Sequence, residues 1–210
     1  MYPIQYNFTG LPGLFGLKLP LFIFASLQLY LNIGLAFSAE EELSRVRTST
    51  EYVRQVDLHN QEVAELERRF GPYDRSLLEP LDALVSLRSG AGDFEEINAL
   101  LGRQLQLVHV TEGPNAYSQL PILESLITNN LKIGDLEVVT NNFQNIQYVF
   151  SQNTDSTVEQ KLESMDNLRN WYLTVFNLDI KRNRIPYFQN SRNLLQQMLR
   201  IASDAYGDKD

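Results

Sequence analysis

The sequence predicts an all-α protein, an α-solenoid of about three stacked helical hairpins preceded by a long helix. The segments that open at Gly92 and Gly134 resemble each other at a separation of 42 residues, and apolar residues recur at three- and four-residue spacing. Period-two alternation is nowhere sustained, so strands are not expected. A hairpin of about forty residues cannot bury its apolar faces alone, whereas stacked neighbours share a continuous core.

The composition narrows the classes of function. The chain has 210 residues, of which 43% are hydrophobic, and a formal net charge of −8. This apolar content is enough for a folded core. The acidic balance repels phosphate backbones and no basic stripe in the sequence offsets it, so nucleic-acid binding is not expected. The absence of cysteine excludes disulfides, thiolate metal sites and a cysteine nucleophile.

The first 38 residues are typical of a signal peptide or a membrane anchor. Lys18 is the only charged residue among the first 39, and residues 19–37 form an uncharged, mostly apolar run. Small residues at Ala36 and Ser38 favour cleavage between Ser38 and Ala39; an uncleaved anchor and a buried segment of a cytosolic fold are the alternatives. A signal or an anchor places the rest in the periplasm or cell envelope, with membrane contact only through this segment.

An N-terminal helical segment is expected over 39–70. Apolar residues with charges between them predict a long amphipathic helix over 43–70, and the polar stretch 57–60 leaves a break there as an alternative. Gly71 and Pro72 then end the helix. The apolar positions are Val46, Tyr52, Val53, Val56, Val63, Leu66 and Phe70.

Three repeat units follow, at about 71–112, 113–154 and 155–206. Each is predicted to be a helix, a tight turn and a second helix. About ten extra residues are expected near the end of the third unit, where Pro186 is predicted to interrupt the second helix. A displacement of 42 residues brings the following positions onto an identical or similar residue: Gly71, Pro72, Leu78, Leu81, Leu84, Val85, Gly92, Asp93 and Glu95.

A Gly-Asp pair separates the two helices in the first and second units. We predict Gly92 and Gly134 to be structural hinges, because glycine tolerates positive φ and allows helices to approach closely. Asp93 and Asp135 are predicted to cap the following helices by accepting hydrogen bonds from free backbone amides.

Large apolar residues surround both turns. They are Leu81, Leu84, Val85, Phe94, Ile97 and Leu101 in the first unit, and Leu123, Leu126, Ile127, Leu136, Val139 and Phe143 in the second. Over about residues 70–180 this pattern resembles the tetratricopeptide repeat (TPR) family, in a degenerate bacterial form behind a signal sequence, although the period exceeds the usual 34 residues. HEAT-type repeats, which have the period without the turn, are the second choice. The resemblance implies an exported, non-enzymatic scaffold that binds a protein or peptide through its concave face.

The resemblance also implies a candidate peptide-binding column on that face. The column consists of Asp82, Glu124 and Asp166, each followed four residues later by a polar residue, Ser86, Thr128 or Asn170. A line of carboxylates bordered by hydrogen-bonding groups would suit a basic segment. The alternative interpretation is that these acids stand in the first turns of their helices, where they stabilise the helix dipole without any partner.

An enzyme is the alternative function, specifically a cell-envelope hydrolase or accessory enzyme with carboxylate chemistry. The spacing of the acids identifies no catalytic set. No pair of ligands in the sequence stands at a metal-like spacing and the phosphate-loop spacings are absent, so neither a metal nor a cofactor is expected.

Overall fold

The computed structural model describes residues 45–46, 49–178 and 184–207, all within the compact unit that spans residues 37–210. The segment predicted to be a signal or anchor, 1–38, lies outside the described residues. Within the described part of the chain, no helix is both long and apolar enough to cross a membrane.

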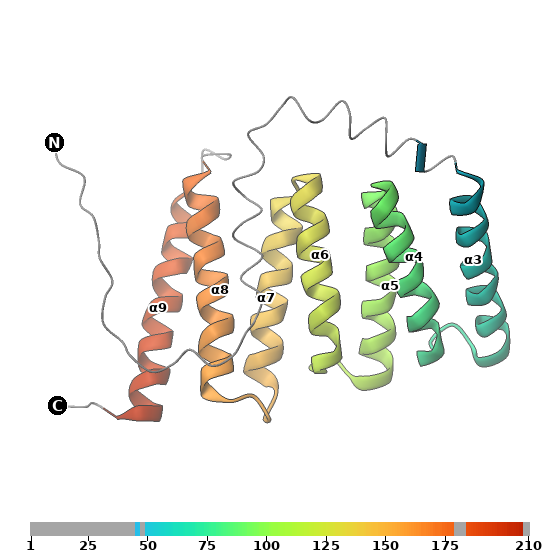
Figure 1. Ribbon diagram of the computed structural model, residues 1–210. Coiled ribbons are helices and arrows are strands. Elements are labelled where there is room, and N and C mark those ends of the chain that lie inside the picture. Colours follow the sequence, from blue (N-terminus) through green and yellow to red (C-terminus); the bar gives the residue numbers. More distant parts are fainter. Residues whose placement is uncertain (1–44, 47–48, 179–183, 208–210) are drawn as a thin grey trace. The chain divides into compact units, whose positions relative to one another are not determined.

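The described residues fold into seven α-helices and two 3-10 turns, without a strand, and the predicted all-α solenoid is confirmed. Each helix packs against the next one in the chain, so that the helices lie side by side in sequence order (Figure 1). The elements are α3 (Thr50–Phe70), η2 (Arg75–Leu77), α4 (Leu78–Ala91), α5 (Phe94–Glu112), η3 (Tyr117–Gln119), α6 (Leu120–Ile133), α7 (Leu136–Gln152), α8 (Val158–Asn177) and α9 (Ile185–Tyr206).

The 42-residue repeat relates elements as well as residues. η2 and η3 begin 42 residues apart, and so do α4 and α6, each of which is 14 residues long. Gly71 and Gly113, the glycines that precede these units, have nearly the same backbone angles, with φ of 93° and 94°. The same local sequence therefore produces the same chain path twice.

Gly92 and Gly134 end the first helices of their units in the left-handed conformation, with φ of 70° and 83°. In each turn the next amide reaches back to the helix: Asp93 N donates to Arg88 O at 3.1 Å, and Asp135 N donates to Asn130 O at 3.0 Å. These bonds form a Schellman motif, which a residue with a β-carbon enters only under strain.

The two aspartates of the turns behave differently. Asp135 caps α7 by accepting from Val138 N at 3.1 Å, whereas within the described residues Asp93 makes no such side-chain bond to α5. The prediction for Asp93 is therefore wrong. Its carboxylate instead accepts from the Tyr52 hydroxyl at 2.9 Å and pairs with Arg88 at 3.3 Å, which ties α3 to the turn of the first unit.

Gly134 offers a direct test of the turn. A β-carbon there would meet no described atom within 4 Å, so the cost of Gly134→Ala comes from φ alone and is about 1–2 kcal/mol of unfolding free energy. The matched control is Gly102, which lies inside α5 in similarly open space, where Gly102→Ala is expected to stabilise by about 0.5–1 kcal/mol. Urea denaturation measures both, and a shift of the same sign for the two variants would contradict the left-handed turn.

The third unit departs from the first two. α8 is 20 residues long and begins with a capping box between Thr157 and Gln160, and no Gly-Asp turn follows it. The prediction that Pro186 interrupts the second helix is wrong. Pro186 lies in the first turn of α9. Proline is tolerated there because the first amides of a helix have no partner within the helix.

The N-terminal helix is shorter than predicted and continuous. α3 begins after Ser49, whose side chain accepts from Tyr52 N at 3.1 Å, and it runs through 57–60 without a break. Val56 and Val63 are buried against the first unit. Val46, Val53 and Phe70, which were expected on the same apolar face, are exposed.

The core is continuous from unit to unit. Ile97 and Leu101 of α5 pack with Leu123 and Leu126 of α6, and so join the first unit to the second. A second joint connects α7 to α8, where Trp171 is buried among the apolar residues of the last two units. Such neighbour-to-neighbour packing is what stabilises a solenoid.

Candidate functional site

The six residues of the predicted column do not all line one groove. Glu124 and Thr128 of α6 line a common groove, whereas Asp82 and Ser86 are exposed on α4 and do not line it. Asp166 and Asn170 lie on α8, outside that groove. The groove therefore contains one acid and one polar residue of the column, and the column across α4, α6 and α8 stays a prediction.

The alternative interpretation, that the acids stabilise helix dipoles from the first turn, is wrong. Asp82 and Glu124 are the fifth residues of α4 and α6, and Asp166 is the ninth residue of α8. In these described helices the first-turn acids are Glu79 of α4 and Glu159 of α8, and α6 has none. Dipole effects fall off within the first turn, so they do not account for the column.

Asp166 is already paired within α8. Its Oδ1 accepts from Arg169 Nε at 2.9 Å and its Oδ2 accepts from Asn170 Nδ2 at 3.0 Å. Arg169 also donates through Nη2 to Asn170 at 2.9 Å, which closes a small polar cluster. A carboxylate with these partners has little electrostatic reason to bind a further cation.

The groove runs between α4 and α6 and has a volume of ≈ 380 Å³. Val85, Ile97 and Leu101 provide its apolar surface, with the latter two on α5. The other lining residues are Ser89 of α4 and six residues of α6, namely Pro121, Glu124, Ser125, Thr128, Asn129 and Lys132. The result is an apolar strip bordered by hydroxyl and charged groups.

Glu124 is the acid of this groove. Although the residue remains exposed at the groove rim, burial raises the pKa of its carboxyl. Among the described residues its carboxylate has neither a hydrogen-bond donor nor a cation as partner, in contrast to Asp166. A desolvated, unpaired carboxylate gains most from a positively charged donor supplied from outside.

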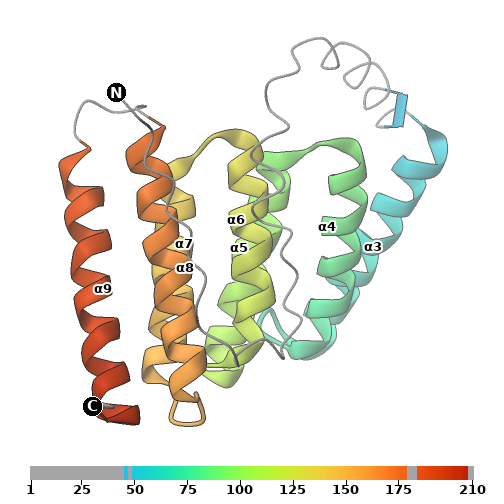
Figure 2. The ribbon, with the colours of Figure 1, turned by 60° about the vertical axis from the view of Figure 1, so that its left-hand side comes forward.

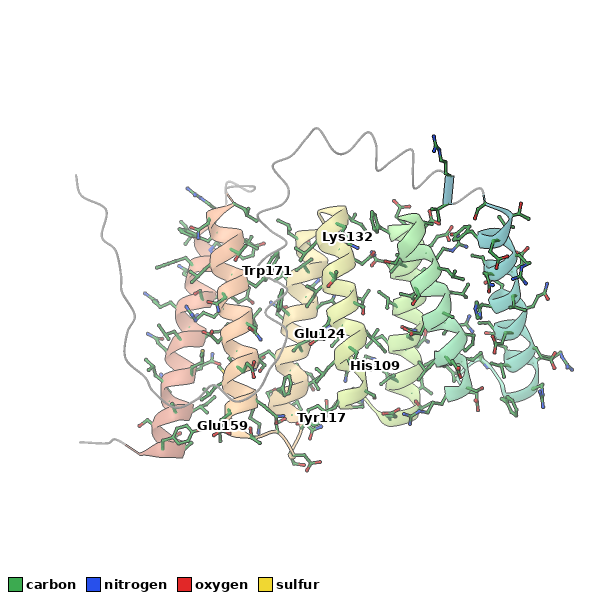
Figure 3. The ribbon with its side chains drawn as sticks, in the orientation of Figure 1. His109, Tyr117, Glu124, Lys132, Glu159 and Trp171 are labelled. Atoms are coloured by element: carbon green, nitrogen blue, oxygen red, sulfur yellow. The ribbon has the colours of Figure 1, made fainter. Side chains whose placement is uncertain are left out.

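Lys132 is the cation of the same groove. Its Nζ lies over the Phe94 ring, 5.3 Å from the centroid, and it forms no ion pair with a described carboxylate. Lys132 follows Glu124 by eight residues, so the two lie on one face of α6 at about 12 Å along its axis. Figure 3 shows Glu124 near the middle of α6 and Lys132 towards its end.

A buried asparagine cluster fixes the wall of the groove. Asn129 Nδ2 donates to Phe94 O at 2.6 Å and to Asn98 Oδ1 at 2.8 Å. Asn130, only 1% exposed, exchanges hydrogen bonds with Asn98 at 2.9 Å in both directions. These bonds join α5 to α6 and fix the α6 side of the groove against α5.

The repeat argument missed Lys132 and Ser89. The residues that correspond to Lys132 at the 42-residue displacement are Gly90 and Thr174, so no charge recurs along that column. A signal was nevertheless present, because eight residues are about 2.2 helical turns, which places Lys132 within roughly 80° of Glu124 around the axis of any helix.

Glu124 is the one carboxylate among the described lining residues of the groove, whereas hydrolysis by carboxylates uses a pair. No described cluster of three potential metal ligands occurs anywhere. A second, smaller hollow of ≈ 190 Å³ contains Glu67 and Arg103, but these two side chains already pair with each other.

The sequence matches no family model and no curated protein. Two solved structures are similar to the chain, both of the nearly identical TPR-like repeats of a Podosopora anserina protein described as a kinesin light chain. The first, a point variant, is 14% identical with a TM-score of 0.43, over 80% of this chain and 95% of that one. The second is 14% identical with a TM-score of 0.42, over 81% of this chain and 96% of that one.

Proposed function

We propose that this protein is a non-enzymatic scaffold that binds an extended protein segment in the groove between α4 and α6. The observation that carries the proposal is the Glu124 carboxylate, which is partly desolvated, unpaired among the described residues, and placed beside an apolar strip. A stack of helical hairpins supplies extended surfaces of this kind and holds them rigidly.

The charges of the groove define the chemistry of the segment. We expect Glu124 to bind a basic side chain of the segment and Lys132 to bind an acidic one. The strip of Val85, Ile97 and Leu101 should contact an apolar side chain between them. An extended chain advances about 3.3 Å per residue, so about 12 Å corresponds to four residues. Side chains at i, i+2 and i+4 share one face, which gives the order basic, apolar, acidic at alternate positions.

A blocked pentapeptide, Arg-Ser-Leu-Ser-Glu, tests this proposal when it is labelled and titrated with the full chain in a fluorescence anisotropy assay. We expect saturable binding that weakens as salt rises, because two charge contacts are involved. Replacing the arginine or the glutamate of the peptide by glutamine should each weaken binding by about tenfold. Equal affinity for the parent peptide and for Gln-Ser-Leu-Ser-Gln would contradict a groove that reads charge.

We also propose that the scaffold works outside the cytoplasm, on the basis of the uncharged run 19–37 and the small residues Ala36 and Ser38. Mass spectrometry of the N-terminus of the protein recovered from its own cells measures this. A mature chain that begins at Ala39 is the expected result, and an intact Met1 in a membrane fraction identifies the anchor. An intact Met1 in the soluble cytosolic fraction would contradict export.

A further inference from the structure

α9 carries an apolar stripe that the described helices leave largely uncovered. Leu199 is 62% exposed, Ile185 66% and Leu195 44%, and all are large apolar side chains. The stripe follows a spacing of alternating three and four residues, which is the seam of a helix that pairs with another helix. It consists of Ile185, Phe188, Arg192, Leu195, Leu199, Ala202 and Tyr206.

The middle of this stripe is separate from the face by which α9 joins the solenoid. Towards its ends, the Phe188 ring lies 5.6 Å from the Phe176 ring of α8, and the Tyr206 hydroxyl donates to Glu159 of α8, yet both side chains remain about half exposed. That face includes Tyr187, Leu194, Met198 and Ile201, which pack into the core cluster shared with α8. α9 stands at the end of the row of described helices, beside α8 (Figure 2). The helix thus has one apolar face in use and a second one beside it exposed.

The second helix of the first unit, α5, indicates which kind of element packs on the α9 stripe. α5 and α9 end at Gly113 and Gly207, which are 94 residues apart and share similar backbone angles. Counted back from these glycines, Phe188, Leu195 and Leu199 correspond to Phe94, Leu101 and Leu105 of α5, the residues that pack against Leu123 and Leu126 of α6. On α9 the equivalent face is thus built to receive an antiparallel helix.

We infer that the α9 stripe pairs antiparallel with the α9 stripe of a second copy of this chain. In the register with its two-fold axis at residue 197, Leu195 meets the second copy's Leu199, and Phe188 meets its Tyr206. Arg192 then faces the small Ala202, which leaves room for the arginine stem to run to the edge of the seam. The apolar residues are therefore self-complementary in this direction.

Charge favours the same occupant. The chain has a net charge of −8, so two copies repel each other over most surfaces. The charged residues of α9 are Arg192, Arg200 and Asp204, so this helix does not share the acidic excess of the chain as a whole. A 22-residue helix is about 33 Å long, a small interface, and we expect a dissociation constant on the order of 10 μM.

Sedimentation equilibrium of the full chain tests the pairing over about 1–100 μM. The chain should be a concentration-dependent dimer, and Leu199→Glu should raise the dissociation constant at least about tenfold. Gln197→Glu, on the polar side of the same helix, is the matched control and should leave it unchanged. A monomeric chain throughout, or a dimer that tolerates Leu199→Glu, would overturn the inference and point to another occupant or another surface.

Direction is tested separately, because the natural chain has no cysteine. In Arg192→Cys/Ala202→Cys the two sulfurs lie about 15 Å apart within one helix and cannot join, whereas the antiparallel pair places each opposite its partner. Oxidation should give a covalent dimer, and the variant with Leu199→Glu added should lose it. Failure of the double cysteine variant to cross-link while it still dimerises would overturn the antiparallel register.

Discussion

Replacing Trp171 by alanine is expected to lower the free energy of unfolding by about 3–5 kcal/mol, the usual range for a buried tryptophan. Trp171 is 5% exposed, stacks on Phe143 with ring centroids 5.5 Å apart, and donates through Nε1 to Thr140 Oγ1 at 2.8 Å. Both partners lie on α7, so this side chain is a principal connection between the second and third units.

The effect should be local as well as large. In a solenoid each unit is stabilised by its neighbours, so loss of Trp171 should leave α8 and α9 to unfold before α4 and α5. Hydrogen exchange measures this order residue by residue. Thr140→Val is the matched control, since it keeps the ring stack but removes the hydroxyl that accepts from Trp171 and donates to Leu136 O, and it should cost about 1–3 kcal/mol. Uniform loss of protection along the chain would contradict a contact between α7 and α8 that can be lost without unfolding the first unit.

The second large effect concerns Glu124. Glu124→Gln should weaken binding of the Arg-Ser-Leu-Ser-Glu peptide by about tenfold or more, because the neutral amide keeps the shape of the side chain and removes its charge. Asp82→Asn is the matched control, since Asp82 occupies the equivalent position on α4, is exposed, and does not line the groove. It should leave the affinity unchanged.

The same substitution should have a pH-dependent effect on stability. Burial raises the pKa of Glu124 in the fold, so the folded protein holds this proton more tightly than the unfolded chain does. Stability contributed by the protonated carboxyl is therefore present at acid pH and is lost as pH rises through the raised pKa. Glu124→Gln should be more stable than the natural chain at neutral pH, with the difference vanishing below the ordinary carboxyl pKa.

Thermal melts between pH 3 and pH 8 follow this difference, with Asp82→Asn as the reference. An advantage of Glu124→Gln that grows as pH falls would contradict the desolvated carboxylate. If Glu124→Gln loses peptide binding and gains stability, Glu124 contributes to binding of the partner at a cost in the stability of the fold.

The repeat predicted the fold correctly in the two units that follow the 42-residue pattern. Gly92 and Gly134, with equivalent leucines before them, made the C-terminal ends of α4 and α6 predictable. The third unit escaped prediction because α8 starts at its own capping box and lacks the Gly-Asp turn, so Pro186 was misread as a break. The repeat period and the turn residues are local signals, so they no longer predict the structure where the local sequence departs from the repeat.

The site was less predictable because a groove is a property of packing. Glu124 and Thr128 were found from the repeat, but the 42-residue period does not show the side-chain contacts that distinguish one residue of the column from another. Asp166 binds Arg169, while Glu124 faces an apolar strip. Lys132 has no charged counterpart in the other units, so its role appears only when α4, α5 and α6 are assembled.

A double-mutant cycle between Glu124 and the peptide arginine tests the central proposal most directly. Affinities are measured for the natural chain and Glu124→Gln, each with Arg-Ser-Leu-Ser-Glu and with Gln-Ser-Leu-Ser-Glu. A direct contact predicts that each single change weakens binding by about tenfold and that the second change then adds almost nothing, a coupling of about 1.4 kcal/mol. Independent, additive losses, or no loss in Glu124→Gln, would show that the partner binds elsewhere on the solenoid.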